Sequence, residues 1–206
     1  MTAKLKVLNV GGNSKKIAIP SWYRDFEHLL LDIDPKGQPD IVCDARELGK
    51  LEAGQFDAIY CSHNLEHYFP HDVRRVLAGF QHVLKPTGFA EIRVPDIDLL
   101  MKTYVEKKMD LEDVLYQSPA GAIMVRDVIY GYSKEIERSG ADFYAHKMGF
   151  SPKSLSRHLA AAGFKAVVRP QGRPYELFMV AFRQQPSEFH RKLFGLKAAQ
   201  ATASLH

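Results

Sequence analysis

Cysteine is scarce in this sequence. Cys43 and Cys61 are the two cysteines among 206 residues, and both lie near the ends of apolar stretches that read as core strands. Their spacing matches no set of metal ligands. We therefore expect both to be small buried hydrophobic side chains, and we expect no metal site.

Long apolar runs are also absent, so no membrane-spanning helix is expected. The opening residues MTAKLKVLNV enter a strand at once and leave no room for a signal peptide. Internal repeats and low-complexity segments are missing too. Because 46% of the residues are hydrophobic and 25% are charged, we expect a soluble globular protein in the cytoplasm.

Charge of one sign does not dominate. The formal net charge is +4, and basic residues are scattered among acidic ones rather than gathered into one block. This charge allows nucleic-acid binding but does not suggest it. The length of 206 residues fits one domain with an insertion or a tail, and it allows a homodimer.

The most informative stretch runs from residue 5 to residue 34. It contains the apolar run LKVLNV, the pair Gly11-Gly12, an irregular segment and a second apolar run that ends in acid, LLLDIDP. Glycines let the backbone approach a ligand, and an acid after the next strand can accept hydrogen bonds from a ribose diol. Asp32 follows Gly11 by about twenty residues, the separation expected in a βαβ unit. The stretch reads either as the entrance to a nucleotide-type pocket or as a plain turn of an α/β domain.

Strands and helices alternate as far as Asp96. Strands are expected at 5–10, 29–33, 40–43, 56–61 and 89–94, and helices at 21–28 and 70–84. This alternation predicts an α/β fold with a parallel sheet and right-handed crossovers. A helix at 151–162 then leads into strands at 164–169 and 176–183. Because the turn between these strands contains no helix, they should pair antiparallel.

Two further segments depart from the alternation. Residues 97–148 read as helices without strands, at 99–108, 111–116 and 123–139. We interpret them as a helical insertion that packs as a lid over the carboxyl ends of the sheet. The expected organisation is one domain over 1–183, followed by a polar, basic tail over 184–206 that is loosely held.

Six segments carry a resemblance to a known family. They are NVGG, LLLDIDP, DIVCDA, FDAIYCSHNLEHY, VLKPTGFAEIRVPD and FSPKSLSRHLAAAGF. In this serial order they resemble class I S-adenosylmethionine-dependent methyltransferases, above all the small bacterial type 11 enzymes with an NVGCG turn and an SH-LEH segment. The resemblance covers residues 5–183. It implies a Rossmann-like three-layer αβα sandwich, with a seven-stranded, mainly parallel sheet, an antiparallel last strand and a helical insertion after strand five.

The resemblance also implies S-adenosylmethionine as cofactor and S-adenosylhomocysteine as product. The region of Gly11 would face the methionine part of the cofactor, and Asp32 would accept hydrogen bonds from the ribose hydroxyls. Asp44 would take the adenine amino group while the Ala45 backbone holds the ring. The full set of implied cofactor-binding residues is Asn9, Gly11, Gly12, Asn13, Asp32, Ile33, Asp44, Ala45, Ser62 and His63.

The glycine turn departs from the family pattern. Asn9 stands in place of the usual acid, Asn13 in place of the second glycine and Lys15 in place of the third. Because Asn tolerates the left-handed conformation, Asn13 can preserve the backbone of the turn. The same changes allow weakened binding. A non-catalytic scaffold or binding protein with a degenerate cofactor site is therefore the alternative reading.

The candidate catalytic residues follow strand four. Methyl transfer needs an acceptor held in line with the S–CH3 bond, and a hydroxyl acceptor also needs a base. His67 is the first candidate, because histidine titrates near neutral pH and this loop borders the methyl group. His63 and Glu66 are the others. In LEH segments of this fold, Glu66 and His67 also orient the loop, which is the competing interpretation. Candidates elsewhere are Asp96, Tyr104, Tyr130, Tyr144 and His146.

The methyl acceptor is expected to bind at the insertion. The basic residues Arg126, Lys134, Arg138 and Lys147 would suit a polar or anionic small molecule, such as a sugar, a nucleotide-sugar or a carboxylate metabolite. An RNA or protein methyltransferase is disfavoured, because no NPPY-like tetrapeptide follows strand four. The sequence therefore predicts a methyltransferase that acts on a small molecule.

Overall fold

The computed structural model describes residues 4–196, and its centre is a seven-stranded sheet in the order β3-β2-β1-β4-β5-β9-β8. The strands are Lys6–Val10 (β1), Glu27–Asp32 (β2), Ile41–Val42 (β3), Phe56–Ser62 (β4), Leu84–Pro95 (β5), Ala166–Val168 (β8) and Glu176–Phe182 (β9). β9 is antiparallel to both of its neighbours, and the other pairs are parallel. The predicted α/β fold and its antiparallel last strand are confirmed.

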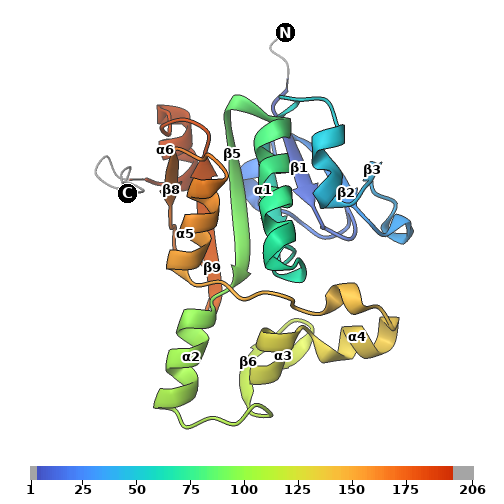
Figure 1. Cartoon of the computed structure of the whole chain (residues 1–206), viewed down its shortest axis with the longest axis vertical. Coiled ribbons are helices and arrows are strands. Elements are labelled where there is room, and N and C mark those ends of the chain that lie inside the picture. The colour runs from blue at the N-terminus through green and yellow to red at the C-terminus, as the bar shows by residue number, and fades with distance from the viewer. Residues whose placement is uncertain (1–3, 197–206) are drawn as a thin grey trace.

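Helices cover both faces of the sheet (Figure 1). The helices α1 (Pro70–Val83) and α5 (Pro152–Ala161) and the 3₁₀ helix η3 (Ala45–Lys50) pack over the larger core. The 3₁₀ helix η1 (Ser21–Tyr23) and α6 (Glu188–Phe194) pack over the smaller core on the other face. Helix α1 begins at a proline, which suits a first helical position. Its apolar side chains recur at helical spacing, and the stripe that includes Val73, Leu77 and Phe80 is fully buried.

The helix predicted over 21–28 is wrong. The chain makes the single 3₁₀ turn of η1, and β2 begins at Glu27, where it pairs with Lys6. The reason lies across the sheet, where the buried Glu91 carboxylate accepts hydrogen bonds from Trp22 Nε1 at 2.9 Å and Tyr23 Oη at 2.8 Å. These anchors hold the short crossover close to the sheet and leave no length for a regular helix.

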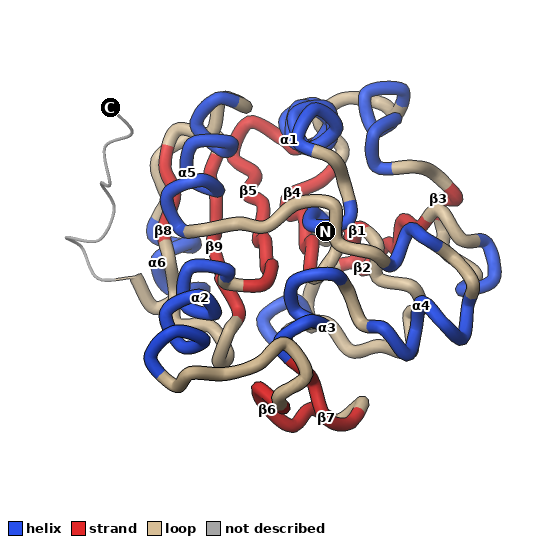
Figure 2. The backbone as a smooth tube through the Cα atoms, turned by 60° about the horizontal axis from the view of Figure 1, so that its bottom comes forward, coloured by secondary structure: helices blue, strands red, loops and turns tan. Residues whose placement is uncertain are grey.

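The insertion lies across the carboxyl edge of the sheet (Figures 1 and 2). Its elements are α2 (Ile97–Glu106), β6 (Val114–Ser118), β7 (Gly121–Met124), α3 (Val125–Tyr130), α4 (Ser133–Ser139) and the 3₁₀ helix η5 (Asp142–Tyr144). The expected helix over 111–116 is wrong, because β6 forms an antiparallel hairpin with β7. Valine, tyrosine and isoleucine in this stretch favour strands, and Gly121, at φ 113°, supplies the turn.

The helix predicted over 123–139 is divided in two. Gly131 has a φ of 104°, which no continuing helix allows. The Asp127 carboxylate accepts hydrogen bonds from the backbone nitrogens of Met124 at 3.0 Å and Ser133 at 3.2 Å. One side chain therefore caps the start of α3 and the start of α4.

The described part of the predicted tail is packed rather than loosely held. Helix α6 is capped by Ser187, whose hydroxyl accepts from His190 N at 3.4 Å. The His190 ring contacts the rings of Phe89 and Phe182, at centroid distances of 5.3 and 5.1 Å. Phe194 packs against the same core. The rest of the predicted tail, residues 197–206, lies outside the described residues.

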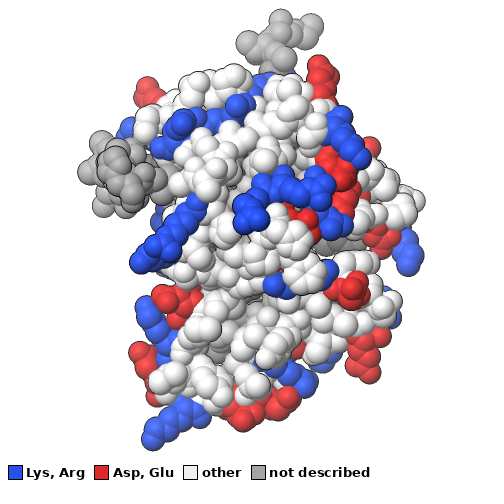
Figure 3. Space-filling model, in the orientation of Figure 1, with Lys and Arg blue, Asp and Glu red and all other residues white. Residues whose placement is uncertain are grey.

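Charges on the surface are mixed. On the face seen in Figure 3, Lys and Arg side chains are interspersed with Asp and Glu. Within residues 4–196, no helix has the length and apolarity needed to cross a membrane.

Candidate functional site

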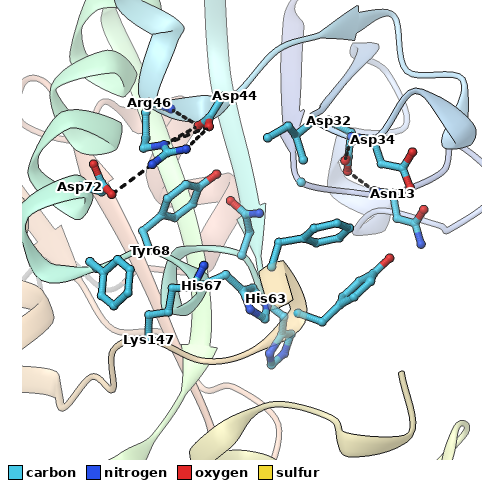
Figure 4. Close-up of a pocket in the computed structure, with 16 residues that line it drawn as sticks. Asn13, Asp32, Asp34, Asp44, Arg46, His63, His67, Tyr68, Asp72 and Lys147 are labelled. Carbon is cyan, nitrogen blue, oxygen red and sulfur yellow. Dashed lines mark hydrogen bonds and ion pairs between the residues drawn. The ribbon is translucent and has the colours of Figure 1, made fainter. Parts of the chain in front are cut away.

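A cavity of about 190 Å³ lies at the carboxyl ends of β1, β2 and β4 (Figure 4). It is lined by six of the residues that the resemblance implied for the cofactor: Gly11, Asn13, Asp32, Ile33, Asp44 and His63. Asn9, Gly12, Ala45 and Ser62 are not among its lining residues. The carboxyl edge of an open α/β sheet is where such folds bind ligands.

The glycine turn keeps its left-handed geometry without the family glycines. Gly11 has a φ of 72° and Asn13 a φ of 59°, so the asparagine adopts the conformation predicted for it. The Asp32 carboxylate holds this turn, accepting from Asn13 N at 2.8 Å and from Asp34 N at 2.9 Å. A carboxylate can accept about four hydrogen bonds, so Asp32 keeps capacity for the two hydroxyls of a ribose.

Asp44 is held by a neighbour that sequence reasoning missed. Arg46 donates to Asp44 Oδ2 through Nε at 2.9 Å and through Nη2 at 2.6 Å, and it reaches Asp72 Oδ2 at 3.3 Å (Figure 4). Burial alone would raise the pKa of Asp44, but the hydrogen bonds and charge of Arg46 lower it. The backbone nitrogen of Arg46 also donates to Asp44 Oδ1, at 2.9 Å. The carboxylate is therefore ionised and oriented, and it retains room for about one further donor, such as an amino group.

His63 lies between two carboxylates. Its Nδ1 is 3.4 Å from Glu66 Oε1, and its Nε2 is 3.5 Å from Glu176 Oε2. Burial opposes a charge on the ring, but the two acids outweigh it and raise the pKa of His63 to about 9. A histidine that is protonated at neutral pH is a poor general base, so His63 is poorly suited to that role.

A chain of charges continues beneath His63 along the sheet. Arg93 Nη1 contacts Glu176 Oε1 at 2.7 Å, and Arg93 Nε contacts Glu91 Oε1 at 2.8 Å. Although burial opposes it, the hydrogen bond from His63 and the charge of Arg93 lower the pKa of Glu176 to about 2. Alternating charges thus run from β5 through β9 to His63 at the rim of the site.

His67 and His146 lie side by side, with ring centroids 5.0 Å apart. His67 Nδ1 is 3.1 Å from the carbonyl oxygen of Ala145, and His146 Nδ1 is 2.9 Å from that of Val128. A carbonyl oxygen can only accept, so each neutral ring carries its proton on Nδ1. The Nε2 atom of each ring is left with a free lone pair.

A second cavity of about 250 Å³ lies between the sheet edge and the insertion. Its lining residues are His63, His67, Pro95, Tyr116, Ile123, Asp127, Val128, Tyr132, Glu135, Tyr144, His146 and Tyr175. It shares His63, His67 and Tyr144 with the first cavity. The two cavities therefore meet at the loop after β4, where the first-choice base was predicted.

The basic residues of the insertion lie outside this second cavity, whose described lining contains neither Lys nor Arg. Arg126 pairs with Glu112 at 2.9 Å, Arg138 pairs with Glu135, and Lys134 lines a different hollow. Lys147 lines the first cavity instead. The charge composition of the insertion thus says little about the ligand of the second cavity.

Three other candidates do not line either cavity. Asp96 caps α2 through Leu99 N at 3.1 Å and pairs with Arg169 at 2.9 Å. Tyr104 packs in the small core of the insertion, and Tyr130 is exposed. Glu66 also lines neither cavity, being buried beneath the loop.

Sequence reasoning missed several lining residues. In the first cavity they are Arg46, Asn64, Tyr68, Phe69, Asp72 and Phe143, and in the second Tyr116, Tyr132 and Tyr175. Asn64 sits inside the recognised SHNLEHY segment, so its position was a usable signal. Tyr116 and Tyr175 had none, because the β6–β7 hairpin and the turn before β9 bring them together only in space.

Comparisons with known proteins agree with this architecture. Residues 26–92 match the family described as "Methyltransferase domain". No curated protein sequence matches the chain.

Solved structures of S-adenosylmethionine-dependent methyltransferases share the fold at low sequence identity. The enzyme from Archaeoglobus fulgidus has 15% identity and a TM-score of 0.53, over 87% of this chain and 86% of that one. The one from Mesorhizobium loti has 19% identity and a TM-score of 0.52, over 87% and 91%. One from Methanosarcina mazei has 15% identity and a TM-score of 0.51, over 88% and 92%. Residues 26–92 thus match a methyltransferase domain family, and the chain shares the fold of these S-adenosylmethionine-dependent methyltransferases.

Proposed function

We propose that this protein transfers a methyl group from S-adenosylmethionine to an uncharged, polar small molecule. The observation that carries the proposal is the meeting of two cavities at His63, His67 and Tyr144. One cavity has the acids and the glycine turn that suit the cofactor, and the other is walled by tyrosines. A methyl donor in the first would have its reactive end beside an acceptor in the second.

The residues of the first cavity fit the cofactor. Asp32 has hydrogen-bonding capacity for the ribose, and Asp44 has capacity for the adenine amino group. Ile33 is 51% exposed at the rim, so its side chain offers an apolar surface to the adenine ring. Gly11 and Asn13 bring the backbone of the turn to the methionine part. When bound, the cofactor supplies an electrophilic methyl group on a sulfonium.

The second cavity would orient the acceptor. Tyr116 and Tyr175 stack with their centroids 5.8 Å apart and planes 12° from parallel, so they form an aromatic wall. Since the described lining lacks Lys and Arg, it suits a neutral acceptor better than an anionic one. Transfer would form a bond from the acceptor oxygen or nitrogen to the methyl carbon as the S–CH3 bond breaks. The acceptor's proton passes to the free Nε2 of His67, and S-adenosylhomocysteine is the other product.

Titration with S-adenosylhomocysteine tests the cofactor half of the proposal. At a hundred-fold excess over the dissociation constant, binding should stabilise the fold by about 2.7 kcal/mol, a rise in Tm of roughly 5–10 °C for a chain of this size. Calorimetry should give one site per chain. The absence of both binding heat and a shift in Tm at millimolar ligand would contradict the proposal.

That contradictory outcome would favour a non-catalytic scaffold. Two observations support this second candidate. The Asn64 side chain lies against Gly11, and Arg46 Nη2 already donates a hydrogen bond to Asp44 Oδ2. Both contacts stand where the cofactor would bind. If they close the site, Arg46→Ala together with Asn64→Ala should restore binding that the natural chain lacks.

A further inference from the structure

A buried carboxylate and two imidazoles come together beside the second cavity, the one proposed to hold the methyl acceptor. Glu66 and His67 come from the 3₁₀ turn η4 (Leu65–His67), and His146 comes from the end of the insertion. One ligand atom from each of the three lies within 4.8 Å of the other two. The two segments are tied together, because Glu66 O accepts from the backbone nitrogens of Lys147 at 2.8 Å and Met148 at 3.2 Å.

The two histidines are oriented as metal ligands usually are. A ligating histidine typically donates its second ring N–H to a backbone carbonyl or a carboxylate, which fixes the tautomer and leaves the other nitrogen free. His67 has this arrangement with Ala145 O, at 3.1 Å, and His146 has it with Val128 O, at 2.9 Å. The second partners of both ligands are therefore already in place.

The Glu66 carboxylate is buried with few polar neighbours among the described residues. Glu66 is 1% exposed, and among the described residues neither of its side-chain oxygens has a hydrogen-bond partner. Its ion-pair neighbours, His63 Nδ1 at 3.4 Å and His146 Nε2 at 4.0 Å, both approach Oε1. A buried carboxylate is unfavourable without a compensating partner. His63 also pairs with Glu176. Glu66 Oε2 has no partner among the described residues.

We propose that Glu66, His67 and His146 bind a divalent transition metal, with Zn²⁺ the ion that best suits the ligand set. Two histidines and one glutamate, with an open fourth position, are a known catalytic zinc arrangement. In a tetrahedral site, bond lengths near 2.1 Å place the ligand atoms about 3.4 Å apart. The three ligand atoms now lie within 4.8 Å of one another, so each side chain needs to move by less than about 1 Å. The role given below to the open coordination position rests on the function proposed above.

The open position faces the acceptor. His67 and His146 both line the tyrosine-walled cavity, and His67 also lines the cofactor cavity. A metal held by their Nε2 atoms can bind an oxygen of the acceptor and hold it at the junction of the cavities. In the metal-bound protein, the ion then takes over the activating role of the free His67 Nε2.

Metal binding by the full chain tests the site without an acceptor. Protein stripped with a chelator is titrated with Zn²⁺ by calorimetry and with Co²⁺ by absorption, since Co²⁺ reports its coordination geometry. We expect one ion per chain and tetrahedral Co²⁺ bands. His146→Ala and Glu66→Gln should each weaken Zn²⁺ binding by at least about 100-fold. That is the largest loss of metal affinity expected when the replaced residue only hydrogen-bonds to a ligand. His71→Ala, at an exposed histidine of α1, should bind as the natural chain does.

Two outcomes would overturn the site. One is the absence of stoichiometric Zn²⁺ or Co²⁺ binding by the natural chain, which does not depend on whether any variant folds. The other is undiminished binding by folded His146→Ala. S-adenosylhomocysteine titration of the stripped protein separates the two proposals. A protein that binds S-adenosylhomocysteine but not Zn²⁺ contradicts the metal site alone, and one that binds Zn²⁺ but not S-adenosylhomocysteine contradicts the cofactor site alone.

Discussion

The Asn64 side chain covers the Cα of Gly11: a Cβ built on that glycine would stand 2.1 Å from Asn64 Nδ2. Gly11 also has a φ of 72°, so both its backbone and its surroundings require glycine. The turn of the candidate cofactor cavity is therefore shaped by a side chain from the loop after β4.

Replacing Gly11 with alanine should lower the free energy of unfolding by more than the positive φ alone explains. Gly54 has a similar φ of 67° but no atom within 4 Å of a built Cβ, so Gly54→Ala measures the angle by itself, at about 1 kcal/mol. Gly11→Ala adds overpacking of about 1–3 kcal/mol. Urea unfolding of both variants checks this, and equal losses would show that Asn64 moves aside freely.

Asp32→Ala should remove most of the affinity for S-adenosylhomocysteine. The carboxylate holds Asn13 N and Asp34 N as well as facing the cavity, so we also expect a loss of stability of about 1–3 kcal/mol. Calorimetry at a temperature where the variant is folded measures the affinity. Asp98→Ala, on the exposed face of α2, is the matched control. Unchanged affinity in folded Asp32→Ala would contradict the assigned site.

The Glu91–Arg93 pair should show strong coupling. Glu91 is fully buried and Arg93 nearly so, and their side chains meet at 2.8 Å. Arg93→Met leaves a buried carboxylate with only neutral donors, and should cost about 3–5 kcal/mol. Adding Glu91→Gln should recover part of that loss, because an amide tolerates the apolar site better. A double-mutant cycle measures the interaction, and simple additivity would disprove the coupling.

Acid should weaken the insertion through Asp127. Burial tends to raise the pKa of this carboxyl, but hydrogen bonds from Ser133 and Met124 outweigh burial and lower the pKa. A carboxyl whose pKa is lowered by folding stabilises the fold above its unfolded pKa of about 3.9. That contribution is lost as the pH falls through the folded value.

Asp127→Asn supplies the comparison. At neutral pH the variant should be less stable by about 0.5–2 kcal/mol, the range for a weakened cap. The difference from the natural chain should shrink as the pH falls below about 4. Thermal unfolding at several pH values measures it. A difference that stays constant with pH would mean that the charge of Asp127 contributes nothing.

Local patterns in the sequence were enough for the central sheet. Buried strands such as Val7–Val10 and the amphipathic stripe of α1 are dictated by hydrophobic periodicity, which acts over a few residues. The left-handed Asn13 follows from the same kind of local preference. The mainly parallel sheet followed from the alternation of strands and helices, since such crossovers join parallel strands.

Prediction from local sequence patterns failed where contacts with residues far along the chain outweighed the local helix or loop preference. Ser21–His28 reads as a helix, yet Trp22 and Tyr23 are bound to Glu91 about seventy residues away in sequence, a partner that periodicity does not reveal. The segment 184–196 reads as a loose tail because its apolar residues are few, yet α6 covers the second face of the sheet. In both cases tertiary contacts outweighed weak local preferences.

By itself, the sequence determined the fold class and the edge of the sheet where Asp32, Asp44 and His67 gather, because chain-local patterns place those residues at strand ends. The tertiary structure alone decided that His63 is charged between two acids, that Arg46 clamps Asp44, and that Glu66, His67 and His146 meet. Each of these depends on distances between segments far apart in the chain. Coulomb interaction, desolvation and metal coordination act through such distances, which sequence spacing does not contain.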